Sequence, residues 1–290
     1  AEGRRFESGP GRLYSMKEKK RGLKVPLKGK YVAMVAPSFV VDFSYPEIIS
    51  YLKKLGFDKV VEATFGAKMV NREYHSSLKA SFGLKISTAC PGIVDLVKRK
   101  YPERVKDLVP VDSPMIAMGK ICRKVYPGYK IIFISPCNYK KIEAKNSKFI
   151  DGVVDFNELK ELVKGIKISG KKEYFDKFYN DYTKIYPLAG GLSKTVHLKG
   201  ILKKKEVKVI DGVGKVTKFL DKPSKEIKFL DCNFCIGGCV GGPCIGSKKS
   251  LRLKRKRVLD YLKFSLKEDI PEVKKGLIDR AKGISFRKKF

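Results

Sequence analysis

The chain has 290 residues, enough for one large or two modest domains with an apolar core, and 43% of them are hydrophobic. No stretch is long and apolar enough for a membrane span, and the N-terminus lacks the apolar segment of a secretory signal, so we expect a cytoplasmic protein without membrane contact. The 64 lysines and arginines outnumber the 30 aspartates and glutamates, which gives a net charge of +34 that would attract polyanions and acidic proteins. These basic residues are spread along the chain, and a lysine-rich composition without Gln is typical of a thermophile, so nucleic acid is not the partner we expect.

Strands and helices are predicted to alternate along the first hundred residues. Short apolar runs that end at Pro, Gly or polar residues predict strands, and apolar residues at helical spacing predict helices between them. Such alternation is typical of a parallel sheet covered by helices. The predicted strands are 31–36, 59–63 and 84–87, and the predicted helices are 45–55, 67–77 and 93–100.

The same alternation continues in the remainder of the chain, except in the Lys- and Tyr-rich residues 166–205, which show no clear periodicity. No internal repeat of solenoid length is evident. The predicted strands are 130–134, 149–154, 206–210 and 226–230, and the predicted helices are 113–125, 157–164, 215–220 and a basic helix over 248–262.

Seven cysteines indicate a metal site rather than disulfides, because their number is odd and no export signal is visible. Cys122 falls in an expected helix and is interpreted as an ordinary packed residue. The other six follow predicted strands, at the sheet edge where α/β proteins bind ligands. Two of them precede expected helix starts, whose dipole favours thiolate. The three groups are Cys90, Cys137, and the run of Cys232, Cys235, Cys239 and Cys244.

The run from Cys232 to Cys244 carries the most specific signal. Its glycines let the backbone approach an inorganic cluster closely and donate N–H groups to sulfur. Four soft thiolates with no nearby histidine suit an iron–sulfur cluster or structural zinc. Zinc would prefer two Cys-x-x-Cys pairs, and only Cys232 and Cys235 have that spacing. We therefore expect an iron–sulfur cluster, with zinc and inert buried thiols as the alternatives.

Three motifs, in the same order, resemble the catalytic domain of iron–iron (FeFe) hydrogenases. The family's Thr-Ser-Cys-Cys-Pro is similar to Thr88-Ala89-Cys90-Pro91-Gly92, which has one cysteine fewer. Its Met-Pro-Cys-x-x-Lys-x-x-Glu is similar to residues 135–143, where Ser135 replaces the Met. Its Cys-x-x-x-Cys with a glycine run is similar to Cys235 to Cys239 followed by Gly241 and Gly242. Weaker similarities within about residues 30–290 are Ala36-Pro37, Gly66 to Glu73, Ser113-Pro114 and Gly190-Gly191.

This resemblance implies an α/β fold of two lobes, each a mostly parallel sheet flanked by helices, with a metal cofactor between them. The expected lobes are about 30–125 and 126–245, after an N-terminal arm or tag over 1–29 and before a basic tail over 246–290. The implied cofactor is the H-cluster, a 4Fe–4S cubane that shares a cysteine with a two-iron unit bearing carbonyl, cyanide and azadithiolate. The implied cubane ligands are Cys90, Cys137, Cys235 and the bridging Cys239, and no flavin or nicotinamide is expected.

The resemblance also implies which residues surround the two-iron unit, which the protein would bury, orient and hydrogen-bond rather than ligate. Lys140 matches the family's cyanide-contacting lysine, and Glu143 belongs to the same motif. The contacts to the other cyanide and its surroundings match Ala36, Pro37, Ser113 and Pro114. The remaining expected cofactor-binding residues are Ser135, Pro136, Gly190 and Gly191.

The usual proton route is expected to be broken at its first protein step. In typical members a cysteine beside the cubane ligand carries protons, and here that position is Ala89, which cannot relay one. Glu73 falls where the family has a relay glutamate, with a plain helix-surface carboxylate as the alternative. Ser135 would make the pocket more polar, so a water chain in place of the thiol is our hypothesis.

The implied activity is the reversible reduction of protons to hydrogen. No Cys precedes Cys90, so electrons would come directly from an acidic, ferredoxin-like carrier, and maturation enzymes would load the two-iron unit. One alternative is a hydrogen sensor of the same fold, which Ala89 favours; another is a non-catalytic iron–sulfur scaffold related to the eukaryotic hydrogenase-like proteins. Nucleic-acid binding through Lys248 to Arg257 is a further alternative. Cys232 and Cys244, which the family pattern lacks, are packed thiols, proton-handling groups or ligands of something extra.

Overall fold

The computed structural model describes residues 23–168, 173–180 and 182–290. Residues 1–22 of the expected N-terminal arm, and parts of the 166–205 stretch, lie outside the described residues. None of the helices in the described part has the length and apolar character that crossing a bilayer requires.

Two parallel sheets form the framework, as the alternation of strands and helices predicted. The first sheet has the order β2-β1-β4-β5, and the second has the order β3-β7-β6. Every pairing within them is parallel. The strands are β1 (Tyr31–Val35), β2 (Lys59–Glu62), β3 (Lys85–Ile86), β4 (Lys130–Ser135), β5 (Gly152–Asp155), β6 (Val207–Asp211) and β7 (Phe229–Asn233).

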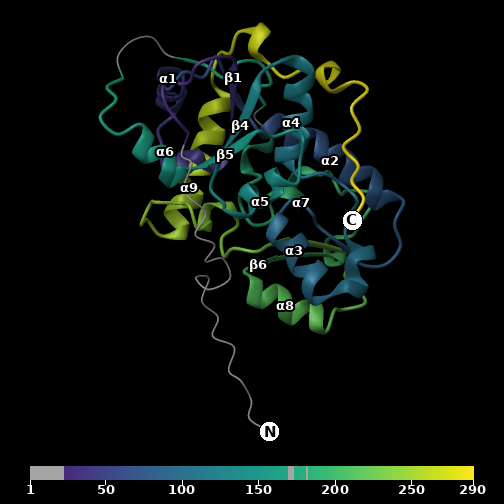
Figure 1. The fold of residues 1–290 in the computed structure, drawn as a ribbon. Helices are drawn as coiled ribbons and strands as arrows, with labels where there is room; N and C mark the ends of the chain where they lie inside the picture. The colour runs from purple at the N-terminus through teal and green to yellow at the C-terminus, as the bar shows by residue number, and fades with distance from the viewer. Residues whose placement is uncertain (1–22, 169–172, 181) are drawn as a thin grey trace.

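Helices cover these sheets (Figure 1), with α1 and α6 on one side of the first sheet and α2 and α4 on the other. The helices are α1 (Glu47–Lys54), α2 (Thr64–Lys79), α3 (Pro91–Lys100), α4 (Pro114–Val125), α5 (Tyr139–Lys145), α6 (Phe156–Leu162), α7 (Gly191–Thr195), α8 (Val213–Asp221) and α9 (Leu251–Leu266). The 3₁₀ turns used below are η1 (Pro37–Val41), η2 (Pro102–Asp107), η3 (Tyr182–Ile185) and η5 (Cys239–Gly241). The sequence did not predict α5 and α7, which have seven and five residues.

The sheets do not follow the expected division of the chain near residue 125. The first sheet takes β4 and β5 from the expected second lobe, and the second sheet takes β3 from the expected first lobe. Lys85 and Ile86 pair with Phe229 and Leu230, more than 140 positions later in the chain. The chain therefore passes from one sheet to the other and back, so that neither sheet is a contiguous segment.

The first sheet changes its direction of growth at β1, which pairs with β2 on one side and with β4 on the other. In open α/β sheets, the crevice beyond the carboxyl ends of strands at such a switch point is where ligands bind. The segments that leave there are Ala36-Pro37 after β1 and Pro136-Cys137 after β4. They lie side by side, because the backbone N–H of Ala36 donates to the carbonyl of Ile134 at 3.0 Å.

The expected basic tail is packed against the protein. In α9, Val258 and Tyr261 are buried, and Arg257 donates to the carbonyl of Val41 at 2.9 Å. Further along, Phe286 is buried, and its carbonyl accepts the N–H of Asp112 at 2.8 Å. The segment after residue 246 thus contributes to the core of the first sheet.

Candidate metal centre

The cysteine-bearing segments leave the carboxyl ends of strands in both sheets. Cys90 follows β3 and is the N-cap residue of α3, and Cys235 follows the neighbouring strand β7. Cys137 follows β4 of the first sheet and lies two residues before α5. Cys239 begins η5 in the loop after β7. The centre therefore lies between the two sheets, where the sequence pattern predicted that thiolates would meet.

The three segments contact one another directly. A Cβ on Gly92 would lie 3.0 Å from both Phe234 and Tyr139, so only glycine lets α3 begin so close to them. The rings of Tyr139 and Phe234 are 5.1 Å apart. These three residues stand one or two positions from Cys90, Cys137 and Cys235 respectively. The packing thus brings together three of the four expected ligands.

Charge effects among the thiols connect Cys239, the fourth expected ligand, with the other three. Burial raises the pKa of Cys137 to about 11, with a further rise from Cys90 and an opposing effect of Lys140. Burial, then Cys90, Cys137 and Cys235, raises the pKa of the Cys239 thiol. These mutual effects indicate that the four thiols, all half-buried, lie within electrostatic range of one another. A metal that binds there must displace their protons, so its affinity will rise with pH.

No group of three or more His, Cys, Asp or Glu side chains within the described residues could hold a single metal ion. Each thiolate of a cubane binds a different iron, so cubane ligands do not converge on one point. The described side chains therefore lack the convergent ligands that one zinc ion, the alternative left open above, would need.

The remaining cysteines have distinct places. Cys122 is fully buried on α4, in agreement with its interpretation as a packed residue. Cys232 lies on β7 in the smaller hydrophobic core, and its backbone N–H donates to Ser87 at 3.0 Å. The thiol of Cys244 donates to Oδ1 of Asn138 at 3.1 Å, and its N–H donates to the carbonyl of Pro136 at 3.1 Å. Cys244 therefore braces the turn that carries Cys137.

Several of the expected cofactor-binding residues lie at the switch point of the first sheet. Ala36 is buried at the end of β1, and Pro37 begins η1. Ser135 closes the turn before Cys137, because its hydroxyl accepts the N–H of Cys137 at 3.1 Å. Next to Pro37, the hydroxyl of Ser38 is buried and has no hydrogen-bond partner among the described residues. Sequence reasoning missed Ser38, although it directly follows the Ala36-Pro37 pair.

Lys140 points to Glu143 across one turn of α5, with Nζ 2.7 Å from Oε2. Their side chains are only 13% and 9% exposed, so Lys140 is not a solvated surface lysine. The sequence predicted both residues as site residues, and the structure joins them in one ion pair beside the cysteines. Pairing with Glu143 fixes the direction of the ammonium.

The other expected contacts lie at helix starts. Ser113 is the buried N-cap of α4, and its hydroxyl accepts the N–H of Ile116 at 3.4 Å; Pro114 is the first helical residue. Gly190 is the N-cap of α7, and Gly191 begins that helix. We call residues 182–190, before α7, the strap, and residues 234–244, after β7, the cysteine loop. The strap reaches the cysteine loop, because the carbonyl of Pro187 accepts the N–H of Cys239 at 2.8 Å.

The two expected proton-relay positions have different surroundings. Ala89 packs beside the main core, where its methyl group has no proton to pass. Glu73 lies on α2, and Nε of Arg287 is 3.4 Å from its carboxylate. Glu73 also lines a groove with Phe286 and other residues of the C-terminal segment. That segment thus covers the place where an outer relay was expected.

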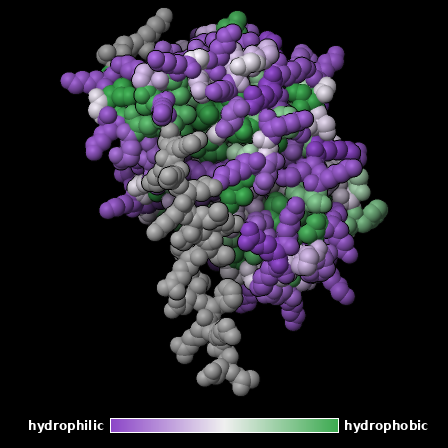
Figure 2. Space-filling model, viewed as in Figure 1, coloured by the Kyte–Doolittle hydropathy of each residue, from purple (hydrophilic) through white to green (hydrophobic). Residues whose placement is uncertain are grey.

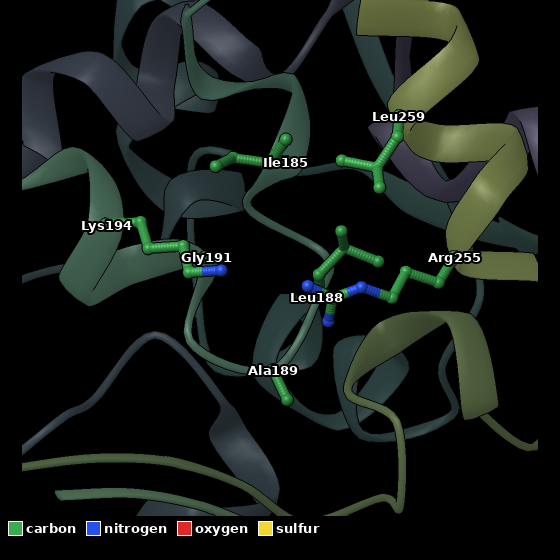
Figure 3. Close-up of a pocket in the computed structure, with 7 residues that line it drawn as sticks. All are labelled: Ile185, Leu188, Ala189, Gly191, Lys194, Arg255 and Leu259. Carbon is green, nitrogen blue, oxygen red and sulfur yellow. The ribbon is translucent and has the colours of Figure 1, made fainter. Parts of the chain in front are cut away.

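A second groove runs beside the cysteine loop. It is lined by Leu188 and Lys194 from the strap and α7, and by Arg255 and Leu259 from α9. Figure 3 shows Arg255 extending from α9 toward Leu188. Because the backbone of Leu188 pairs with Gly238, this basic groove adjoins the loop that carries Cys239.

Comparison with known proteins gives consistent matches. Residues 29–243 match the family described as the iron only hydrogenase large subunit, C-terminal domain. Iron hydrogenase 1 of Clostridium pasteurianum is 26% identical to this chain over an alignment 330 residues long, which includes 88% of this chain. The chain spans 57% of the length of that relative.

Among solved structures, two variants of the FeFe-hydrogenase HydA1 from Chlamydomonas reinhardtii share the fold. One has a TM-score of 0.61 and 17% identity, over 79% of this chain and 83% of the other. The second has a TM-score of 0.58 and 15% identity, over 89% of this chain and 86% of the other. The segment after residue 243, with α9, lies outside the family match.

Proposed function

The chain belongs to the iron-only hydrogenase family, as the C-terminal domain of the large subunit, and from this we propose that it catalyses the reversible reduction of protons to hydrogen. The observation that carries the proposal is the group of four half-buried cysteines, Cys90, Cys137, Cys235 and Cys239, whose segments leave the carboxyl ends of strands in both sheets. The ion pair of Lys140 and Glu143 stands beside them.

We propose that the four thiolates hold a 4Fe–4S cubane and that Cys239 also bridges to a two-iron unit, together forming an H-cluster. The structure of one neighbour in fold, HydA(deltaEFG), reveals stepwise H-cluster assembly in that protein. When bound, this group supplies the site at which electrons and protons combine into hydrogen. No flavin or nicotinamide has a role in the proposal.

The residues around the switch-point crevice fit such a group. The unpartnered hydroxyl of Ser38 is a free donor in a buried place, where a cyanide nitrogen would satisfy it. Lys140 would donate to a second cyanide while Glu143 keeps its side chain in place. Ala36, Pro37 and the start of α4 at Ser113 would enclose the unit and exclude water.

We propose that electrons arrive from an acidic, ferredoxin-like protein that docks over the cysteine loop. Ile236, next to Cys235, is 60% exposed, and Leu251 is 40% exposed and packs on the loop glycines. From Lys248 to Arg257 the chain has seven basic residues and no acidic one. On the face shown in Figure 2, hydrophilic side chains surround small hydrophobic areas. An apolar centre with a basic rim suits an acidic partner.

The two-iron unit requires dedicated maturation enzymes, which we include among the partners. The cysteines are all unpaired, which fits the reducing cytoplasm where we place the protein.

Infrared spectroscopy of the protein matured with those enzymes tests the proposal. We expect absorption bands of iron-bound carbonyl and cyanide, together with hydrogen evolution from a reduced dye. Cys239→Ser should lose the bands, whereas Cys122→Ser, at a buried position outside the centre, should keep them. Iron content without carbonyl and cyanide bands would contradict the proposal and support a cluster-binding scaffold instead.

A hydrogen sensor is the second candidate, because Ala89 cannot carry protons and Glu73 is covered by the C-terminal segment. A sensor would show the same infrared bands, and these would change under hydrogen. It would not evolve hydrogen from the reduced dye at an enzymatic rate.

A further inference from the structure

The hydroxyl of Tyr186 is buried and has no hydrogen-bond partner among the described residues. Leaving such a group unpaired costs about 1–3 kcal/mol, so a buried hydroxyl of this kind has a reason to be there. Tyr186 lies between η3 and α7, and Gly191 fixes its place: a Cβ on Gly191 would collide with the carbonyl of Ile185 and lie 2.8 Å from the Tyr186 Cα. The next residue, Pro187, binds the backbone of Cys239. The strap therefore holds Tyr186 beside the cysteine loop.

Three titratable side chains lie close enough for their charges to act on this hydroxyl. Burial raises the pKa of Tyr186 far above its usual value, and Tyr74, Asp231 and Cys239 raise it further. They come from α2, β7 and the cysteine loop. Tyr186 thus lies within electrostatic range of a buried carboxyl group and of the thiol that we propose as the bridging ligand.

Tyr74 has no proton to offer. Its hydroxyl accepts the N–H of Thr88 at 2.6 Å and lies 2.8 Å from Oγ1 of Thr88. The Thr88 hydroxyl donates to the carbonyls of Val109 and Val111, at 2.9 and 3.0 Å. Because a hydroxyl has a single proton, Thr88 must accept from Tyr74. The proton of Tyr74 is therefore committed, whereas that of Tyr186 is free.

Asp231 is hydrogen-bonded to a residue that is partly exposed to solvent. Its carboxylate is 3% exposed on β7 and accepts the backbone N–H of Ser193 at 2.9 Å. Ser193 is half-buried at the start of α7, and Lys194, the next residue, is exposed. A half-buried residue, Ser193, is therefore the direct neighbour of the Asp231 carboxylate.

Asp231 is also the acidic group of this cluster. Burial raises the pKa of Asp231 above its ordinary 3.8. The titratable side chains on which its charge acts are Tyr74, Tyr186 and Cys232, and burial raises the pKa of each of them away from neutrality.

We propose that Tyr186 and Asp231 form a proton-holding pair beside Cys239, in place of the relay thiol that Ala89 cannot supply. This inference rests on the proposed hydrogenase function. Asp231 takes a proton from solvent past Ser193; Tyr186 gives its hydroxyl proton inward and regains one from Asp231. One proton moves, no electron is transferred, and both groups return to their starting state. Among the described contacts no hydrogen bond joins the two side chains, so we expect a bound water to bridge them.

The first test needs only the cubane, reconstituted into the protein with iron and sulfide. Its midpoint potential, measured against pH, should fall as pH rises, because an added electron near Asp231 favours proton uptake there. Asp231→Asn, which keeps the shape of the side chain, should lose this dependence. Tyr182→Phe, on the same strap but exposed and stacked on His197, should keep it. A dependence that survives in Asp231→Asn would overturn the proposal.

The second test uses the matured protein. Tyr186→Phe removes a hydroxyl that bonds to nothing, so the fold, the iron content and the infrared bands should remain, while the dye-driven rate falls about 10²-fold. Adding Ala89→Cys to Tyr186→Phe should restore turnover, because a relay thiol bypasses the pair. An unchanged rate in Tyr186→Phe, or no recovery with Ala89→Cys, would contradict it. If the parent protein shows no carbonyl and cyanide bands, the proposed hydrogenase function is contradicted. The measurement of the cubane potential would then still test the pair of Tyr186 and Asp231 by itself.

Discussion

Lys184 is a charged side chain inside the main core. Its ammonium lies 2.6 Å from the carboxylate of Glu62 and 2.9 Å from the hydroxyl of Tyr261, and both Lys184 and Glu62 are fully buried. The ammonium also lies over the rings of Tyr179 and Tyr261, 4.4 and 4.3 Å from their centroids. The Lys184 ammonium thus joins η3 to β2 through the carboxylate of Glu62 and to α9 through the hydroxyl of Tyr261.

Lys184→Met should destabilise the protein by about 3–5 kcal/mol, because it leaves the charge of Glu62 buried without a counterion. Combining it with Glu62→Gln should recover part of that loss. Denaturant unfolding of both variants measures this, with Lys199→Met at an exposed position as the control. If Lys184→Met unfolds at the same denaturant concentration as the control, the ion pair contributes nothing to stability.

At the residue scale, motifs predicted the cysteines and Lys140 because their chemistry is visible in residue type and spacing. Ser38 and Tyr186 could not be found in that way. What distinguishes them is a buried hydroxyl without a partner, and the lack of a partner arises only when distant segments pack together.

Asp155 illustrates how one residue ends a strand and starts a helix. Its carboxylate accepts the N–H groups of Asn157 and Glu158 at 3.0 Å, and the Asp155 N–H in turn donates to the carboxylate of Glu158 at 2.9 Å. Lys141 of α5 adds an ion pair at 2.6 Å. Burial would raise the pKa of Asp155, but Lys141 and the two N–H groups outweigh it, and the net pKa is lowered.

Because the folded pKa of Asp155 lies below its ordinary value of 3.8, this carboxylate stabilises the fold above that value. The contribution is lost as the pH falls through the lower, folded pKa. Asp155→Ala should therefore cost about 1–2 kcal/mol at neutral pH, and the difference from the parent should shrink in acid. The difference in unfolding free energy at each pH measures this, with Glu161→Gln on the same helix as the control. A difference that does not change with pH would show that the carboxylate charge is not involved.

At the element scale, apolar runs predicted the strands well, since a buried parallel strand is apolar on both faces. The last strand was misplaced: 226–230 was expected, and β7 covers Phe229–Asn233. The reason is local, because the N–H of Ile227 closes a turn onto Ser224 at 3.2 Å. The helices α5 and α7 escaped prediction because two turns or fewer do not establish a periodicity.

The whole molecule carries a strong positive charge. Whether the basic residues near the cysteine loop govern docking of an acidic carrier can be tested. The double variant Arg252→Glu with Arg255→Glu should lower kcat/KM with an acidic ferredoxin, while the rate with a reduced dye should not change. The loss should shrink at high salt, where charges more than about 3 Å apart are screened.

The matched control is Lys79→Glu with Lys106→Glu, which changes the net charge equally. These lysines are exposed on α2 and η2, near the start of β3 and so at the sheet edge opposite to the cysteines. Equal losses in both double variants would show that overall charge, rather than a defined docking face, governs the encounter.

Sequence patterns predicted the fold class but not the course of the chain between the sheets. A short strand such as Lys85–Ile86 shows its apolar character in the sequence but not its partner. The partner of such a strand depends on which apolar surfaces are left uncovered by the packing of the helices. That packing involves the entire chain. The expected lobe boundary failed for this reason.

The interleaved sheets also determine when the metal centre can exist during synthesis. Cys90 and Cys137 leave the ribosome early, yet β3 has no strand to pair with until β7 and β6 have been made. Cys235 and Cys239 follow β7 directly. A nascent chain therefore exposes two thiols well before their site can close, and iron delivered at that stage would meet an incomplete ligand set. Cluster insertion is therefore expected to follow the synthesis of β7 and of the loop after it.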